Sequence, residues 1–180
     1  MLRENPSGID LGPLQPSLPE RLRSPDQRIR CETPEALTYL QRLPADFGDE
    51  PAQGLRLIGR RDVRSNNSWM HNFQRLVKGK DRCTLQMHPT DMAERRIEDG
   101  SEVAVRSRVG EVRAIVETCE DIMPGVVSLP HGFGHHRPGT RMAIARRNAG
   151  VSCNDITDER HLDALSGNAA VNGVPVEVIS

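Results

Sequence analysis

A polar loop that directly follows a predicted strand, residues 59–72, contains the side chains best suited to hold a ligand. Arg60, Arg61 and Arg64 are planar cations of the kind that pairs with phosphate in a forked geometry. The loop therefore predicts a site for a phosphorylated heterocycle, and the alternative is a solvated loop whose tryptophan packs on the core. Its short donors and acceptors and its one indole ring come from Asn66, Asn67, Ser68, Trp69, His71 and Asn72.

A second loop, residues 129–139, combines glycines with histidines. Gly132 and Gly134 allow a ligand to approach the backbone closely and to reach its N–H groups. His131, His135 and His136 could instead bind a transition metal. However, histidines four residues apart share a face only on a helix, and the glycines disfavour a helix. We therefore expect His131 and His135 to make hydrogen bonds in a ligand loop without a metal, and a three-histidine metal site is the alternative.

A third loop, residues 148–158, is rich in Asn and Asp and includes Asn154. Its side chains could bind a ligand or could stabilise turns by bonding to the nearby backbone, and the residues leave both readings open. No serine-nucleophile elbow, phosphate-binding P-loop or dinucleotide glycine motif occurs in the chain. The residues alone therefore indicate a domain with polar ligand loops and identify no catalytic residue.

The composition argues against several classes of protein. The net charge is −1, from 24 basic and 25 acidic residues, so no overall field attracts nucleic acid or a membrane surface. No apolar run approaches the roughly 20 residues of a membrane-spanning helix, and no apolar signal segment follows Met1. The four cysteines form no C-x-x-C pair, which is typical of free thiols in a reducing compartment. We therefore expect a cytoplasmic protein without a membrane or nucleic-acid partner.

The elements that must position these loops divide the chain near residue 55. Residues 1–54 are rich in proline and predict an extended arm that needs a partner surface, with a short helix over 34–43 capped by Thr33. Residues 55–180 predict a helix over 91–97, capped by Thr90, among short strands. The predicted strands are 55–59, 83–87, 102–106, 111–117, 126–129 and 173–179. The predicted fold class is therefore mainly β with short helices, arranged as a small closed barrel.

Several short motifs occur in an order and spacing that resemble a known domain. The sequence is similar to the C-terminal molybdopterin dinucleotide-binding domain of the dimethyl sulfoxide reductase superfamily, which includes formate dehydrogenases and nitrate reductases. The resemblance covers nearly the whole chain. The motifs are Asn67-Ser68-Trp69-x-His71-Asn72, His88-Pro89-x-Asp91, Ile97-x-Asp99-Gly100, His131-Gly132-x-Gly134-His135, Asn154-Asp155-Ile156-Thr157 and Ser166-Gly167-Asn168.

The resemblance implies a fold and a cofactor. Residues 55–180 should form a double-psi β-barrel that covers two pterins and holds their dinucleotide tails. The implied cofactor is molybdopterin guanine dinucleotide, with its molybdenum held by other domains. The residues expected to bind this cofactor come from all three loops: Gly59, Arg60, Arg64, Asn66, Asn67, Ser68, Trp69, His71, Asn72, His131, Gly132, Gly134, His135 and Asn154.

The resemblance also implies partners. In the family, the molybdenum ligand and the iron–sulfur cysteines lie in N-terminal catalytic domains, and residues 1–180 contain no counterpart of these. We therefore expect this chain to join such domains, or such a subunit, of a molybdenum-dependent oxidoreductase, and we expect no turnover from the chain alone. The alternative is a non-catalytic β-barrel binding module that has lost the cofactor.

Overall fold

The computed structural model describes residues 2–46 and 54–180, and internal contacts divide the chain into two units, Met1–Phe47 and Gly48–Ser180. The first unit contains a 3-10 helix, η1 (Leu2–Glu4), and an α-helix, α1 (Pro34–Asp46). Most of its described side chains are exposed. A partner surface for this segment therefore stays a prediction from the sequence.

Helix α1 begins where the sequence predicts. The Thr33 hydroxyl oxygen accepts the backbone N–H of Ala36 at 3.2 Å, so the predicted N-cap is confirmed. The helix continues through Asp46, three residues beyond the predicted end. None of the helices in the described ranges is long and apolar enough to cross a membrane.

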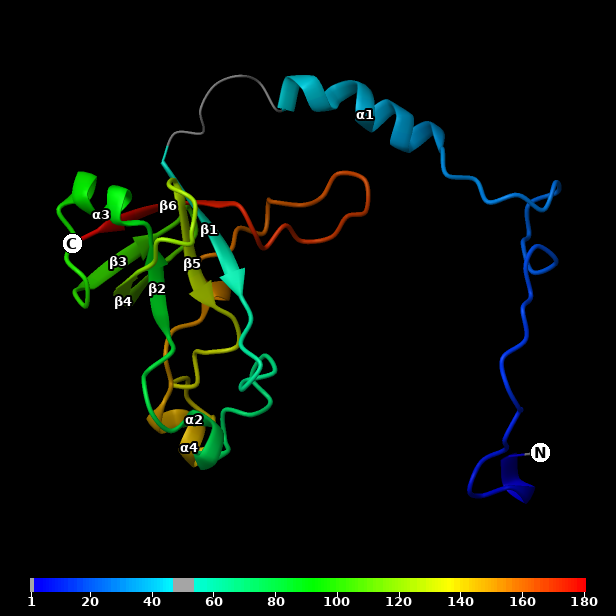
Figure 1. Cartoon of the computed structure of the whole chain (residues 1–180), viewed down its shortest axis with the longest axis horizontal. Helices are drawn as coiled ribbons and strands as arrows, with labels where there is room; N and C mark the ends of the chain where they lie inside the picture. The colour runs from blue at the N-terminus through cyan, green and yellow to red at the C-terminus, as the bar shows by residue number, and fades with distance from the viewer. Residues whose placement is uncertain (1, 47–53) are drawn as a thin grey trace. The chain divides into compact units, whose positions relative to one another are not determined.

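The second unit is a closed barrel of six short strands (Figure 1). The strand order around the barrel is β1-β5-β2-β4-β3-β6, and β6 pairs with β1 to close it. The pairs β1/β5 and β2/β4 are parallel, and the other four pairs are antiparallel. The strands are β1 (Leu55–Arg60), β2 (Thr84–Met87), β3 (Glu102–Arg106), β4 (Glu111–Thr118), β5 (Val126–Pro130) and β6 (Val174–Ile179).

All six predicted strands are present, with ends shifted by one residue at most. The prediction of a mainly β fold with short helices and a closed barrel is confirmed. Strand order and closure do not by themselves identify a double-psi barrel, so that part of the expectation stays a prediction. Strand alternation explains the core, because successive residues of a strand face opposite sides of the sheet. The fully buried side chains include Leu55, Leu57, Leu85, Met87, Val103, Val105, Val116, Val127, Leu129, Ile156 and Val174.

Helix α3 (Pro89–Arg95) corrects the predicted cap. The sequence suggests Thr90 as the N-cap of a helix over 91–97, but the helix begins earlier. Its N-cap is His88, whose Nδ1 accepts the Thr90 backbone N–H at 3.1 Å. Pro89 then occupies the first helical position, where its missing N–H would have had no partner within the helix. The prediction was wrong because an imidazole nitrogen can cap a helix as an Asn or Ser oxygen does.

Two very short helices, α2 (Gln74–Val77) and α4 (Ala143–Arg147), and the 3-10 helix η2 (Cys153–Asp155) were not predicted. Segments of three to five residues are too short to show a helical period in the sequence. Helices α2 and α4 lie together at one end of the barrel, and residues of both line the same cavity (Figure 1). The loops of that end therefore carry more regular structure than their sequence suggests.

The side chain of Arg60 ties three strand ends together beneath these loops. Its Nη1 donates to the Ser128 carbonyl of β5 at 2.6 Å. Its Nη2 donates to the Thr84 carbonyl of β2 at 2.7 Å, to the Thr84 hydroxyl at 3.0 Å and to the Arg82 carbonyl at 3.2 Å. Burial lowers the pKa of Arg60. A cation that loses part of its water needs such acceptors to replace it, so this set of bonds, which we call the Arg60 clamp, belongs to the fold.

The Arg60 clamp leads to a prediction about stability. Replacing Arg60 with Ala should lower the free energy of unfolding by about 1.5–3 kcal/mol, the range for hydrogen bonds to charged groups. Urea denaturation measures this loss. Arg56→Ala is the matched control, because Arg56 lies on the same strand and makes a single 3.5 Å bond to the Gly173 carbonyl. Equal losses from both substitutions would show that the clamp contributes nothing.

Candidate functional site

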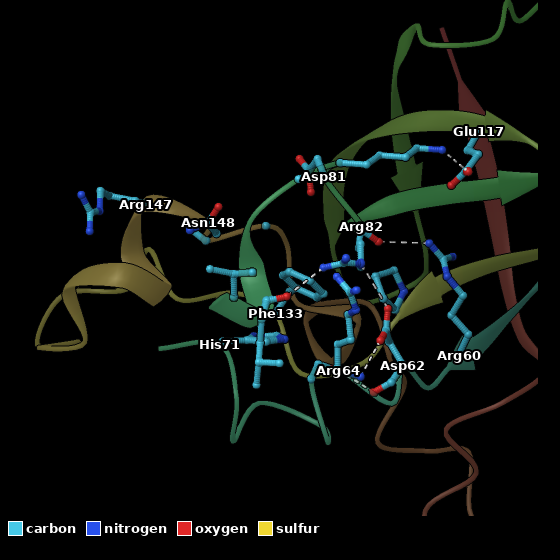
Figure 2. A pocket seen from close by; sticks show the side chains of 18 of the residues that line it. Arg60, Asp62, Arg64, His71, Asp81, Arg82, Glu117, Phe133, Arg147 and Asn148 are labelled. Carbon is cyan, nitrogen blue, oxygen red and sulfur yellow. Dashed lines mark hydrogen bonds and ion pairs between the residues drawn. The ribbon is translucent and has the colours of Figure 1, made fainter. Parts of the chain in front are cut away.

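A cavity of about 420 Å³ opens at the end of the barrel that carries α2 and α4 (Figure 2). Its volume falls within the range of small-molecule and cofactor pockets, roughly 300–1,000 Å³. The end of β1, the loop after it, the segment from α2 to β2, and the loop from α4 onward form the walls. The lining residues are Arg60, Asp62, Arg64, Ser65, His71, Leu76, Val77, Gly79, Lys80, Asp81, Arg82, Gln86, Glu117, Pro130, Phe133, Arg147, Asn148, Ala149 and Gly150.

The cavity lining includes five cations and three carboxylates. Lys80 is paired, because its Nζ donates to Glu117 Oε1 at 2.6 Å. Arg82 is paired as well, since its Nη1 donates to the Leu76 carbonyl at 3.1 Å and its Nε lies 3.6 Å from an Asp62 oxygen.

The guanidinium groups of Arg64 and Arg147 make no hydrogen bond or ion pair with the part of the chain that the structure describes. Both residues line the cavity and are exposed. Arg60 also lines the cavity, but its Nη groups are committed to the clamp. Arg64 and Arg147 are therefore the lining cations that are free to bind an anion.

Glu117 of β4 connects the clamp to the cavity wall. Its Oε2 accepts the Thr84 hydroxyl at 2.5 Å, and the same hydroxyl accepts from Arg60. Hydrogen bonds from Lys80 and then Thr84 lower the pKa of the Glu117 carboxyl. The carboxylate therefore stays ionised at neutral pH and holds Lys80 at the rim.

The loop after β1 is shaped by its own backbone. Asp62 accepts the Arg64 backbone N–H through Oδ1 at 2.7 Å, and its carbonyl accepts N–H groups from Ser65 and Asn66. Asn66 and Asn67 have left-handed backbones, with φ of 42° and 61°. Asparagine tolerates that region better than most residues. The two asparagines therefore form a turn, and neither lines the cavity.

Two buried histidines join the first loop to the second. His71 Nδ1 and His135 Nε2 are 2.7 Å apart, and the two rings meet edge to face. Phe133 packs on His71 with ring centroids 4.3 Å apart. Burial and the neighbouring His135 lower the pKa of His71, and burial lowers the pKa of His135. Both rings are therefore neutral at pH 7 and share a single proton between the facing nitrogens.

Glycines let the three loops pack backbone against backbone. A Cβ at Gly132 would overlap the Asn67 carbonyl group, and a Cβ at Gly134 would overlap Ser152. Both glycines also have a positive φ. Gly134 N donates to the Ala149 carbonyl at 2.8 Å. The three loops singled out in the sequence are thus brought together at one end of the barrel.

The predicted binding residues divide into two groups. Arg60, Arg64 and His71 line the cavity. The others lie outside the lining, and several hold the loops in place: Asn72 Oδ1 accepts the backbone N–H groups of Ile144 and Ala145 at the start of α4, at 3.1 and 3.3 Å. The predicted residues outside the lining are Gly59, Asn66, Asn67, Ser68, Trp69, Asn72, His131, Gly132, Gly134, His135 and Asn154.

Sequence reasoning missed two wall segments. One is the stretch from Leu76 to Arg82, where Lys80, Asp81 and Arg82 line the cavity. The sequence could have indicated this segment, because it is a basic, glycine-containing turn just before a predicted strand. The other is Arg147 at the end of α4, which gave no signal because the helix is so short.

The cysteines and histidines near the cavity do not form a metal centre among the described residues, where no group of three potential metal ligands occurs. Burial raises the pKa of the Cys83 thiol to about 11, and Cys83 Sγ accepts the Val151 N–H at 3.2 Å. Cys153 Sγ lies 3.7 Å from His131 Nδ1, and burial raises the pKa of that thiol too. Both cysteines therefore pack as neutral thiols.

Comparison with known proteins agrees with this architecture. Residues 55–175 match the family model described as Molydopterin dinucleotide binding domain. The chain is 29% identical over 141 residues to ArrA, the molybdopterin-containing subunit of the arsenate respiratory reductase of Shewanella sp. strain ANA-3, covering 72% of this chain and 16% of that protein. It is 26% identical over 121 residues to a subunit of tetrathionate reductase from Salmonella typhimurium, covering 58% of this chain and 12% of that protein.

The fold is also found in a solved structure. Acetylene hydratase from Pelobacter acetylenicus matches with a TM-score of 0.54 and 15% identity, over 78% of this chain and 19% of that one. The chain thus spans less than a fifth of the length of each of these relatives. The family model covers more than half of the chain and coincides with the barrel that carries the cavity. The chain therefore belongs to the family of molybdopterin dinucleotide-binding domains in the dimethyl sulfoxide reductase superfamily.

Proposed function

We propose that the cavity binds one end of a molybdopterin guanine dinucleotide. The observation that carries this proposal is the pair of unbonded guanidinium groups, Arg64 and Arg147, on a cavity that also borders the buried ring of His71. Guanidinium groups bind phosphate oxygens through paired N–H donors, and a dinucleotide supplies a pyrophosphate. The remaining lining offers an aromatic face at Phe133 and polar backbone at Gly150 for a heterocycle.

Guanine as the base is supported by the carboxylate of Asp81. Asp81 Oδ1 accepts the Cys83 N–H at 2.9 Å, and Oδ2 makes no bond within the described residues. Guanine presents an adjacent N–H and amino group, which suit a carboxylate acceptor. Cytosine presents the amino donor alone. The predicted specificity for guanine therefore rests on an acceptor at the rim of the cavity.

In the proposed whole protein, this chain forms the cofactor-covering part of a cytoplasmic molybdenum oxidoreductase. The bound cofactor would supply oxygen-atom or electron transfer at molybdenum. The chain's own residues would bind and orient the dinucleotide, and catalytic domains or a catalytic subunit would hold the metal. The names of the two curated relatives support this reading, since both are parts of reductases and one is described as molybdopterin-containing. A barrel that has lost the cofactor is the competing reading.

Cofactor analysis tests the proposal directly. The chain should be produced together with the catalytic domains in a host that makes the cofactor, then denatured in acid, and the released nucleotide and metal identified. We expect guanosine monophosphate together with molybdenum. Cytidine monophosphate would contradict the guanine assignment, and neither nucleotide nor molybdenum would favour the barrel without cofactor.

The two free arginines lead to a matched pair of variants. Arg64→Ala or Arg147→Ala should weaken retention of the dinucleotide by about 1.5–3 kcal/mol each, because each removes a charge-assisted hydrogen bond to phosphate. Arg146→Ala is the control, since Arg146 precedes Arg147 on α4 and does not line the cavity. Retention is measured as bound nucleotide after dialysis. Equal retention in all three variants would remove the phosphate site from this cavity.

The predicted partner surface gives a third test. Most described side chains of residues 3–42 are exposed, including Arg21, Arg23 and Arg28, which are trypsin sites. In the isolated chain trypsin should cut this segment before the barrel, and addition of the catalytic domains with cofactor should protect it. Mass spectrometry of timed digests identifies the cuts. A segment that resists trypsin in the isolated chain would argue against its role as a docking arm.

A further inference from the structure

Charge is distributed unevenly over the barrel unit. Residues 63–80 and 122–154, which carry α2 and α4, contain eight basic and no acidic residues. The remaining residues of 54–180 contain ten basic and sixteen acidic residues. The net charge of −1 for the whole chain therefore hides a strongly basic region around the two short helices.

Part of this basic charge already has a role. Arg64 and Arg147 line the cavity, Lys80 is paired with Glu117, and an Arg137 nitrogen donates to an Asp155 oxygen.

Arg75, Lys78 and Arg141 have no such role. All three are exposed and lie outside the cavity lining, and their side chains make no hydrogen bond or ion pair with the described residues. Arg75 and Lys78 are three residues apart on or beside α2, where like charges repel each other. Opposite charge from outside this chain would relieve that repulsion.

Exposed apolar side chains accompany these cations. Phe73 at the start of α2 is 58% exposed, and Met142 at the start of α4 is 41% exposed. The two helices lie side by side (Figure 1), because Asn72 Oδ1 accepts the backbone N–H groups of Ile144 and Ala145 in α4. The resulting patch, which we call the α2–α4 surface, consists of Phe73, Arg75, Lys78, Arg141 and Met142.

The composition of the α2–α4 surface indicates a protein partner. Aromatic residues, Met and Arg are enriched in the centres of protein interfaces, whereas Asp and Glu are depleted there. A small anion would use the cations and leave Phe73 and Met142 in water. A protein surface with carboxylates around an apolar centre would use both kinds of side chain.

The position of the α2–α4 surface indicates which protein this is. Arg147 belongs to α4 and lines the cavity, so the α2–α4 surface adjoins the cavity. A dinucleotide bound in the cavity by one end leaves its other end outside. The protein that holds that other end must therefore lie beside the α2–α4 surface.

We propose that the α2–α4 surface docks on an acidic patch of the catalytic domains, with carboxylates facing Arg75, Lys78 and Arg141 and an apolar side chain packed on Phe73. This inference rests on the proposed function, because the partner is the protein that holds the metal end of the cofactor. It adds the surface of this chain that makes the contact and the chemistry of that contact. Since the contact residues lie outside the cavity lining, docking and cofactor retention can be measured separately.

Association kinetics test the docking surface. The full 180-residue chain is immobilised, and its binding to the cofactor-loaded catalytic domains is followed by biolayer interferometry. Arg75→Glu and Arg141→Glu should each slow association roughly 3- to 10-fold in about 0.05 M salt, and the difference should shrink in about 0.5 M salt because of screening. Phe73→Ser should instead speed dissociation at both salt concentrations, because it removes an apolar contact.

Two control variants separate the α2–α4 surface from general charge effects. Arg96→Glu makes the same change of charge at the exposed end of α3, away from α2 and α4 (Figure 1), and should associate as the parent chain does. Arg75→Lys keeps the charge and should also associate as the parent does. Circular dichroism of each variant confirms that the barrel is folded.

The outcomes distinguish this inference from the proposed function, since nucleotide is measured in the same complexes. Folded Arg75→Glu and Arg141→Glu chains that associate as fast as Arg96→Glu overturn the docking surface, whatever nucleotide is retained. Salt-dependent docking without any bound nucleotide supports the docking surface and contradicts the proposed function. An RNA or DNA oligonucleotide that binds the parent chain, loses affinity in Arg75→Glu and displaces the catalytic domains would replace the protein partner and overturn the inference.

Discussion

The end of the barrel that carries the cavity depends on one partly buried cation, Arg60. The Arg60 guanidinium donates to the carbonyl oxygens of Ser128 within β5, of Thr84 at the start of β2 and of Arg82 in the turn before β2. A charge removed from water needs such acceptors, and strand ends that meet at a barrel mouth need donors. Here the carbonyl oxygens of the strands supply the acceptors that the Arg60 charge needs, and Arg60 supplies the donors that these oxygens need. The Arg60 carbonyl in turn accepts the His131 N–H at 3.0 Å, so the second loop leaves the barrel from the same point.

From this base, the loops are held by backbone contacts more than by side chains. Gly132 approaches Asn67 so closely that any Cβ would clash, and Gly134 approaches Ser152 in the same way. The histidine pair then joins the first and second loops through a single 2.7 Å bond. Residues that look like ligand contacts in the sequence therefore often serve the scaffold, and this scaffold shapes the cavity and limits which side chains can reach it.

The five cations that line the cavity have different roles, because some are bonded within the fold and others are not. Arg60 is committed to the clamp, and Lys80 and Arg82 are paired with neighbouring groups. Arg64 and Arg147 keep their donors free at the cavity. The proposed anion site thus consists of guanidinium groups that need not break an existing bond to receive a phosphate. Pre-organisation of this kind reduces the entropy lost on binding.

The sequence by itself determined the barrel, because alternation of apolar residues in strands such as Val103–Val105 depends only on neighbours along the chain. It also located the three loops that meet at the cavity end of the barrel, and it named Arg64 and His71, which line the cavity. Only the tertiary structure decided which polar residues face the cavity, since hydrogen-bond partners such as Ser128 for Arg60 lie far away in sequence. The hydrogen-bond partner of His71 likewise is a ring 64 residues away in the sequence. Local patterns predict elements, whereas the role of a polar group depends on the acceptors and donors that folding places beside it.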